Sequence, residues 1–416
     1  MAGGVVVIAV VGTCASASAP FEPSYAAIPL YADGVVLDED GVPQVVTVGD
    51  DEADDDAAQR ARQDVWLTSG TVPGPERYAS MAEQALRDLD ALVLDNGASL
   101  AGANPAWRYV WPRDASFTVA ALARTGHPED AHEVLAYLQR MQDQRSTGGV
   151  FEARYLPSGT GAVPDDRGLQ LDGNGWVLWA VAEWFEHTEP GAERDRDLEA
   201  LRPLVVRSVA AIRDHVDPVT GLPDVYPDYW EVRERVPTLG TVAALLLGVR
   251  AAEPVLEALG EPSAGPLADL LQGAVDEGFA PDFPRRLGGD EQDTAVAFLM
   301  PPFAPPDAVV EDAWTQAAAA MGRPAGGLAP GAGWKRDGVS WTPTTAVFAL
   351  AAAASGDVEQ AEERLDWLDD HRTARGALPE KVLWDGSPSA VAPLAWTASL
   401  VLLTLDELDR QSAGSS

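Results

Sequence analysis

Two glutamates are the residues of this sequence best suited to acid–base chemistry. Glu231 follows Trp230 in DYWEVRERV, and Glu380 follows a proline in GALPEKV; both stretches are rich in aromatic residues. A pair of carboxyl groups can hydrolyse a glycosidic bond, because one protonates the leaving oxygen and the other activates water or meets the anomeric carbon. The neighbouring indole would exclude water from Glu231 and raise the pKa of its carboxyl. The structural alternative is that Asp228 and Glu231 complement the dipole of the helix that follows.

Two further segments combine tryptophan with charged side chains. NPAWRYVWPRDAS ends in Arg113 and Asp114 just before a helix pattern, and Asp172 in LQLDGNGWVLWA opens another. Aromatic rings stack on the apolar faces of sugars, while guanidinium and carboxylate groups bind hydroxyls. The structural alternatives are a surface ion pair and a helix cap, with most of the 13 tryptophans filling the core.

Motifs for other chemistries are missing from the sequence. The five histidines have no HExxH or other ligand spacing, GxSxG does not occur, and no glycine-rich phosphate loop precedes a helix. Cys14 is the single cysteine, which excludes a disulfide within the chain. We expect neither a metal nor a cofactor. The acidic run Asp50 to Asp56 lacks EF-hand spacing and is interpreted as a solvated loop, with a calcium site as the alternative.

The elements that must position these residues are helices. From Glu76 onward apolar residues recur at helical spacing between Pro and Gly breaks, without strand patterns, so the sequence predicts a single all-α domain over residues 76–412. Long loops should gather at one end of the paired helices, where functional residues concentrate. The predicted helices cover residues 76–95, 114–126, 128–143, 172–188, 197–215, 238–252, 264–279, 307–321, 342–355, 357–371 and 392–411.

The N-terminal part of the sequence has a different character. Residues 1–19 contain a short apolar run followed by Ala-Ser-Ala, which is typical of a secretory signal peptide, although the basic region is missing. Residues 20–75 alternate apolar runs with Asp-Gly turns and predict a β-hairpin arm. We therefore expect a secreted or cell-envelope protein, with a cytoplasmic location as the alternative.

The charge of the chain restricts its partners. With 65 acidic against 29 basic residues the net charge is −36, which repels phosphate backbones and anionic lipid. Beyond the N-terminal segment no apolar run has the length of a membrane span. Nucleic-acid and membrane partners are excluded on these grounds, and neutral substrates fit better.

Taken in order, WPRDAS, LQLDGNG, DYWEVR, GVSWTPTTAVFAL, GALPEKV and SAVAPLAWTAS resemble the glucoamylase family of glycoside hydrolases, which includes glucodextranases, isomaltose glucohydrolases and bacterial trehalases. The resemblance runs from Trp107 to the C-terminus, and the combination of motifs is specific. It implies an (α/α)6 barrel, or six-hairpin toroid, behind the short β arm. It also implies release of β-glucose, with inversion, from the non-reducing end of an α-gluco-oligosaccharide.

The resemblance also assigns roles to residues. Glu231 would be the general acid and Glu380 the general base. The positions matching the family's sugar-binding residues are Trp107, Trp111, Arg113, Asp114, Asp172, Asp228, Trp230, Trp341 and Trp396. A trehalase of the same family and a non-catalytic sugar-binding barrel are the alternatives.

The sequence departs from the family pattern at three places. Pro112 replaces the usual Thr or Val, and the family's arginine before the ninth helix has no secure equivalent, with Lys335 or Arg336 as candidates. The large N-terminal β-sandwich of many bacterial members is reduced to the arm, so one wall of the pocket must come from elsewhere. A second subunit, as in a homodimer, is one source of that wall, and we expect short substrates.

Overall fold

The computed structural model describes residues 25–49, 57–145 and 147–414. The predicted signal peptide, Cys14 and the acidic run Asp50 to Asp56 lie outside the described residues.

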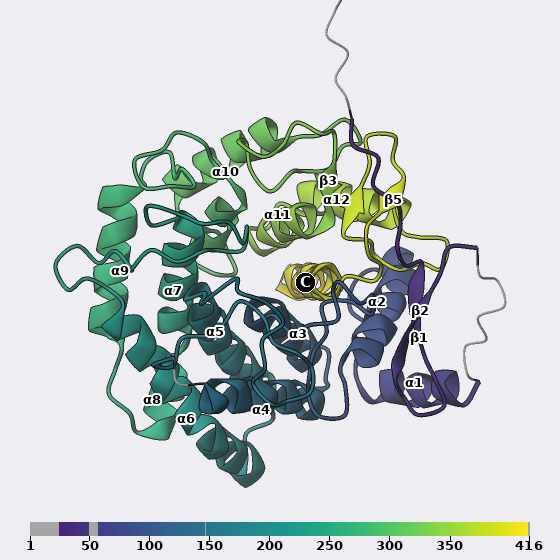
Figure 1. Cartoon of the computed structure of the whole chain (residues 1–416), viewed down its shortest axis with the longest axis horizontal. Coiled ribbons are helices and arrows are strands. Elements are labelled where there is room, and N and C mark those ends of the chain that lie inside the picture. The colour runs from purple at the N-terminus through teal and green to yellow at the C-terminus, as the bar shows by residue number, and fades with distance from the viewer. Residues whose placement is uncertain (1–24, 50–56, 146, 415–416) are drawn as a thin grey trace, which may run out of the picture.

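Six helical segments form a closed inner ring, in which each segment packs against the next (Figure 1). The last of them packs against both the fifth and the first, which closes the ring. In chain order the segments are α3 (Pro112–Arg124), α5 (Asp172–His187), α7 (Leu239–Ala251), the 3₁₀ helix η2 (Thr294–Leu299), α11 (Thr342–Ala354) and α13 (Ala395–Gly414).

A second layer of helices surrounds this ring. Each outer helix precedes an inner one in the chain, so that the described residues form the six helix pairs of an (α/α)6 barrel. The outer helices are α2 (Ala79–Leu92), α4 (Pro128–Gln144), α6 (Ala192–Asp214), α9 (Gly265–Gly278), α10 (Ala308–Met321) and α12 (Val358–Asp370). The short α8 (Glu253–Leu259) packs against α5, α6 and α7.

The sequences of the two layers differ as their environments require. The inner helices α7 and α11 read LGTVAALLLGVRA and TPTTAVFALAAAA and are buried almost throughout, whereas α4 is amphipathic. Proline in the first turn, where its missing N–H costs nothing, starts α3, α4, α9 and α11. Gly175 on α5 and Gly248 on α7 lie at a close approach, because a Cβ at Gly175 would sit 2.1 Å from the carbonyl oxygen of Ala244.

All eleven predicted helices are present, with ends that differ by up to five residues. The inner segment missing from the prediction is η2, whose six residues are too few to show a helical period. The predicted hairpin is also present, since β1 (Gly34–Leu37) pairs antiparallel with β2 (Pro43–Val46), with Gly34 opposite Val46. The helix α1 (Ala57–Ser69) in the same arm is a difference from the prediction, which had given residues 20–75 to the β arm.

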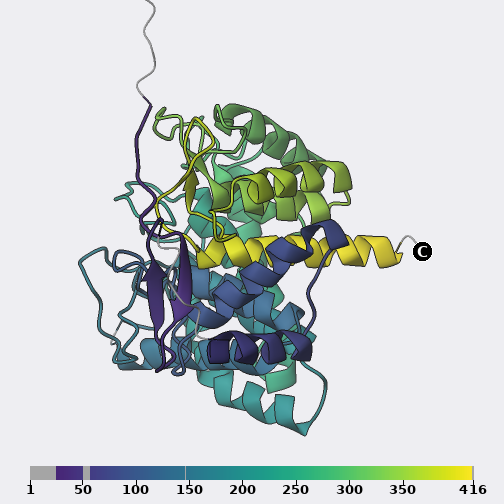
Figure 2. The same cartoon turned by 90° about the vertical axis from the view of Figure 1, so that its right-hand side faces the viewer.

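The long loops and the hairpin β1–β2 gather on one side of the barrel (Figure 2). This is the side at which the inner helices begin. Within the described residues no single helix is both long and apolar enough to cross a membrane; the bent pair α7 and α8 meets that criterion when its two helices are taken together.

Candidate active site

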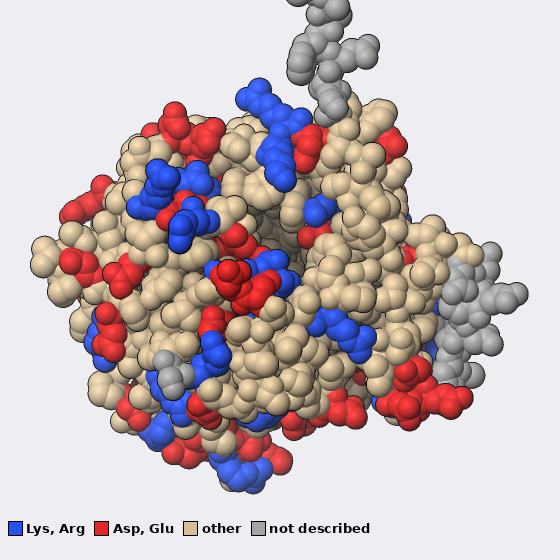
Figure 3. Space-filling model, in the orientation of Figure 1, with Lys and Arg blue, Asp and Glu red and all other residues tan. Residues whose placement is uncertain are grey.

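A cavity of about 390 Å³ opens at the N-terminal ends of the inner helices, and Figure 3 shows it as a hollow near the middle of this face. Its walls come from the first turns of α3, η2, α11 and α13 and from the loops that precede the inner helices. Nine of the predicted site residues line it: Trp107, Trp111, Arg113, Asp114, Trp230, Glu231, Trp341, Glu380 and Trp396.

Glu231 lies in a tight turn before α7. Its backbone N–H donates to the carbonyl oxygen of Asp228 at 2.8 Å, and its φ of +55° is in the left-handed region that a non-glycine residue seldom adopts. Both carboxylate oxygens have partners: the indole N–H of Trp111 donates to Oε1, and Arg167 forms an ion pair with Oε2. The strained turn therefore presents the carboxyl to the cavity from a fixed position.

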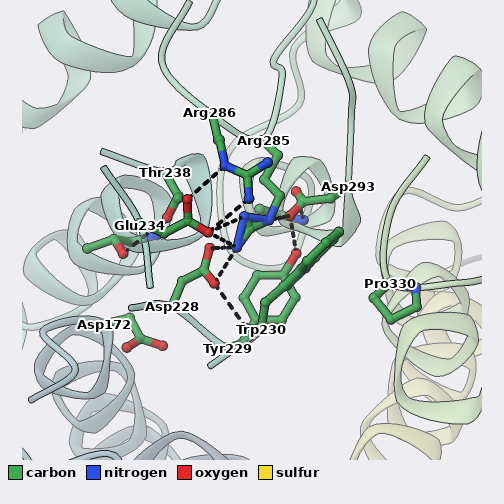
Figure 4. A network of polar contacts seen from close by, with 12 residues as sticks. Asp172, Asp228, Tyr229, Trp230, Glu234, Thr238, Arg285, Arg286, Asp293 and Pro330 are labelled. Atoms are coloured by element: carbon green, nitrogen blue, oxygen red, sulfur yellow. Dashed lines mark hydrogen bonds and ion pairs between the residues drawn. The ribbon is translucent and has the colours of Figure 1, made fainter. Parts of the chain in front are cut away.

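A buried network of charges lies behind this turn (Figure 4). One guanidinium nitrogen of Arg285 contacts Asp228 at 2.7 Å and Glu234 at 2.8 Å, while its Nε lies 3.3 Å from Asp293. The same guanidinium lies 3.9 Å from the centre of the Trp230 ring. Arg285 thus fixes both ends of the turn and the indole between them.

The network holds more acid than base. Tyr229 donates its hydroxyl to Asp293 at 2.6 Å, and Arg286 adds a second contact to Glu234 at 2.7 Å. Burial raises the pKa of Asp293 to about 7, although Arg285 lowers it. Asp228 is fully buried in this network and does not line the cavity. Its contact with Arg285 places it among the residues that position Trp230 and Glu231.

Glu380 lies in the loop before α13 and is held by backbone pairing. Its N–H donates to Val391 at 2.8 Å, its carbonyl accepts from Thr342 at 3.1 Å, and the next residue begins the middle strand of a small antiparallel sheet. That sheet consists of β3 (Ser340–Trp341), β4 (Lys381–Val382) and β5 (Pro388–Ser389).

Two opposing effects act on the ionisation of Glu380. Its side chain is buried, and this burial raises the pKa of the carboxyl, while the ammonium of Lys381, 3.1 Å away, lowers it. Hydrogen bonding from Trp107 also lowers the pKa. Lys381 is itself held 4.2 Å from the centre of the Trp341 ring.

The first turn of α3 presents a guanidinium to the floor of the cavity. Arg113 contacts Asp114 at 3.1 Å and Asp172, on α5, at 3.7 Å, and it lies 5.0 Å from the Trp396 ring. Asp172 is 1% exposed, lies behind Arg113 rather than in the cavity wall, and has its pKa raised to about 7 by burial. Arg113 and Asp114 are buried, so the alternative interpretation of this pair as a surface ion pair is wrong.

Several lining residues were missed by the sequence analysis. Arg154 and Arg167 come from the long loop before α5, which has no periodic pattern to indicate which side chains turn inward. Trp334 also lines the cavity and packs edge-on against Trp230 at 4.4 Å. Its neighbours Lys335 and Arg336, the candidates for the family's arginine, are exposed and do not line the cavity.

The N-terminal arm supports one wall of the cavity from within the same chain. The ring of Tyr31 lies 5.9 Å from that of Trp107, and Arg108 donates to the carbonyl of Pro43 at 2.9 Å. Leu30 pairs with Ala390 in the loop that follows Glu380. The described residues contain no group of three or more His, Cys, Asp or Glu side chains arranged to hold a metal ion.

Comparisons with known proteins agree with the (α/α)6 barrel fold. An isomaltose glucohydrolase of Kribbella flavida is 28% identical over 340 residues, which cover 72% of this chain and 84% of that protein. A wild-type glycosidase of known structure superposes with a TM-score of 0.65 at 24% identity, covering 85% of this chain and 99% of its own. The glucoamylase of Saccharomycopsis fibuligera superposes with a TM-score of 0.64 at 12% identity, covering 87% of this chain and 97% of its own.

A bacterial glucoamylase complexed with acarbose superposes with a TM-score of 0.65 at 15% identity, covering 83% of this chain and 58% of its own. These structures share the (α/α)6 barrel fold. The model of the family "Glycosyl hydrolases family 15" matches residues 97–384, a range that holds both glutamates and most of the cavity wall. This protein therefore belongs to glycosyl hydrolase family 15 and is a glycoside hydrolase.

Proposed function

We propose that this enzyme is an inverting, exo-acting α-glucoside hydrolase that releases β-glucose from the non-reducing end of short α-gluco-oligosaccharides. The observation that carries the proposal is that Glu231 and Glu380 line one cavity, together with six tryptophans and the buried guanidinium of Arg113. Aromatic planes and charged groups in one pocket suit a sugar, and two carboxyl groups suit the cleavage of its glycosidic bond.

In the proposed reaction Glu231 is the general acid and Glu380 the general base. Glu380 removes a proton from a water molecule as the water oxygen bonds to the anomeric carbon. On the opposite side of the sugar the bond to the leaving oxygen breaks, and Glu231 gives that oxygen its proton. Burial favours a pKa of Glu380 closer to neutrality, which makes the carboxylate a better base.

The charge and size of the cavity support a small neutral substrate. Three guanidinium groups and three carboxyl groups line it, so it carries little net charge within a chain of net charge −36. These groups are Arg113, Arg154, Arg167, Asp114, Glu231 and Glu380. A volume of about 390 Å³ suits one or two sugar units better than a long polymer. Similarity to an isomaltose glucohydrolase makes isomaltose the first substrate to try.

The proposal is tested by measuring glucose release from maltose, isomaltose, trehalose, soluble starch and dextran, with proton NMR to identify the first anomer formed. We expect early β-glucose from a disaccharide or short oligosaccharide. Glu231→Gln and Glu380→Gln should each lower kcat by about 10²- to 10⁴-fold, and Glu257→Gln on the exposed face of α8 serves as the control. Early α-glucose, or full activity in both variants, contradicts the proposal. Activity on trehalose alone would assign the chain to the trehalases of the family.

A further inference from the structure

The carboxyl group of Glu231 is capped on both oxygens by side chains of the cavity wall. The Trp111 indole holds one oxygen, and the guanidinium of Arg167 holds the other. A carboxyl between two N–H donors is stabilised as the carboxylate, particularly when one donor carries a positive charge. This arrangement therefore favours the charged form of Glu231, whereas the proposed reaction requires the protonated form.

Arg167 reaches Glu231 from a short paired loop before α5. Ala153 donates to the carbonyl of Gly168 at 2.9 Å, and Glu152 pairs with Leu169. The next residue on each side of this pairing is an arginine, so that Arg154 and Arg167 leave the loop together and both line the cavity. Arg167 therefore contacts Oε2 of Glu231 inside the cavity, and a leaving group that takes its proton from Glu231 must approach the same carboxyl.

The two arginines differ in how firmly they are held. Arg154 lies 4.2 Å from the centre of the Tyr109 ring and 5.0 Å from that of Trp111, and its side chain is 9% exposed. The side chain of Arg167 is 35% exposed. Arg154 is thus fixed in the wall, whereas Arg167 has room to change partner.

An alternative anionic partner for Arg167 is already within reach. Its Nε lies 3.2 Å from Oδ2 of Asp165, the same oxygen that pairs with Arg154. Burial and the neighbouring charge of Arg154 both lower the pKa of Arg167, while the carboxylate of Asp165 raises it. If the Arg167 side chain moved away from Glu231, it would therefore keep its contact with the Asp165 carboxylate. The other charged groups that line the same cavity are Arg113 and Asp114 on α3 and Glu380 before α13.

We propose that Arg167 determines specificity for the leaving group: it caps Glu231 in the empty enzyme and transfers to the hydroxyl groups of the leaving sugar when substrate binds. The transfer frees Oε2 of Glu231 to take up a proton from solvent and to meet the glycosidic oxygen. Leaving groups with hydroxyls near this oxygen, such as a second sugar unit, promote the transfer, whereas alkyl and aryl leaving groups do not. This inference rests on the proposed role of Glu231 as the general acid.

The first test compares the pH dependence of kcat/KM, which reports the free enzyme, with that of kcat, which reports the enzyme–substrate complex. In the wild type we expect the basic limb of kcat/KM at a lower pH than that of kcat, because Arg167 lowers the pKa of Glu231 only in the free enzyme. In Arg167→Met the kcat/KM limb should rise by about one pH unit or more, since an opposite charge in contact shifts a carboxyl by roughly 1–3 units. The kcat limb should stay in place.

Two further variants keep this test decisive. Arg167→Lys retains the positive charge and should keep most of the separation between the limbs, while Arg213→Met, on the exposed surface of α6, should leave both profiles unchanged. Specificity should change as well. Arg167→Met should lose about tenfold or more in kcat/KM on the best disaccharide and little on p-nitrophenyl α-glucoside. Unmoved limbs, limbs that move together, or equal losses on both substrates would overturn the proposal.

A binding measurement separates this inference from the proposed function. The iminosugar 1-deoxynojirimycin binds as a cation, and calorimetric titration requires no turnover. Without the Arg167 cation the iminosugar should bind about tenfold more tightly to Arg167→Met than to wild type at neutral pH, and equal affinity would contradict the cap. Should the wild type bind the iminosugar with this difference and yet hydrolyse no α-glucoside, the proposed reaction fails while the cap on Glu231 stands.

Discussion

Replacing Arg285 with methionine should remove the positive charge that holds the turn around Glu231 together. Its side chain is 3% exposed and contacts Asp228 and Glu234, whose side chains are 0% and 3% exposed, with Asp293 3.3 Å from its Nε. Methionine fills much of the same space but leaves these carboxyl groups buried without the cation. Breaking a buried ion pair by removing one partner costs about 3–5 kcal/mol.

The expected change in melting temperature follows from the size of the chain. Unfolding entropy is about 2.1 cal/mol/K per residue, or roughly 0.9 kcal/mol/K for a chain of this length. A loss of about 4 kcal/mol therefore corresponds to a melting temperature lower by roughly 5 °C. Thermal unfolding by circular dichroism and urea titration would measure both quantities, and kcat should fall as well because the Trp230 indole loses the guanidinium beneath it.

Arg286→Met is the matched control for this prediction. Arg286 contacts the same Glu234, yet its side chain is 42% exposed, so its removal should cost only about 0–1 kcal/mol. The deficit of Arg285→Met should also shrink as the pH falls from 7 to 5. Buried carboxyls without a cation have folded-state pKa values above the unfolded ones, and their cost is lost when they protonate. Equal stability of the two variants, or a deficit that grows at low pH, would refute the reasoning.

Two further predictions concern the base and the packing of the inner ring. Lys381→Met should raise the pKa of Glu380, so that the carboxylate protonates, and activity is lost, at a higher pH. We expect the acidic limb of kcat/KM to move up by about one pH unit. The same limb should stay in place in the control variant Lys335→Met. Gly175→Ala should destabilise the barrel by about 3 kcal/mol, because the new Cβ would overlap the backbone of α7, and its melting temperature should fall accordingly. Gly273→Ala on α9 meets open space and should be neutral or slightly stabilising; similar melting temperatures for the two variants would contradict this account.

The parts of the structure that the sequence predicted are those with a strong local signal. The longer helices of the barrel, with Pro and Gly at their ends, have a period that can be read directly, and the segments that hold Glu231 and Glu380 stand out by their tryptophans. The segment η2 was missed because it forms a single short 3₁₀ helix. It belongs to the inner ring because it contacts α7 and α11, and these contacts exist only in the folded chain.

The positions of charged residues relative to the cavity were the least predictable feature. Asp172 and Asp228 stand in motifs with lining residues, yet both lie one layer behind the wall, where they contact Arg113 and Arg285. Arg167 was not singled out at all, because its contact with Glu231 joins two loops that are far apart in the sequence. Such pairings depend on how loops cross the mouth of the barrel, and no periodicity encodes that.

The closure of the inner ring by α13 sets an order for the synthesis of the protein. Ring contacts between α13 and α3 join the last described helix to the first inner one, and Leu30 pairs with Ala390 about 360 residues later. At a synthesis rate of roughly 5–20 residues per second, Ala390 is added on the order of 20 to 70 s after Leu30. A nascent chain that ends before Ala395 already holds both glutamates but lacks the wall that Trp396 supplies. The pocket is thus complete only after α13 has been synthesised.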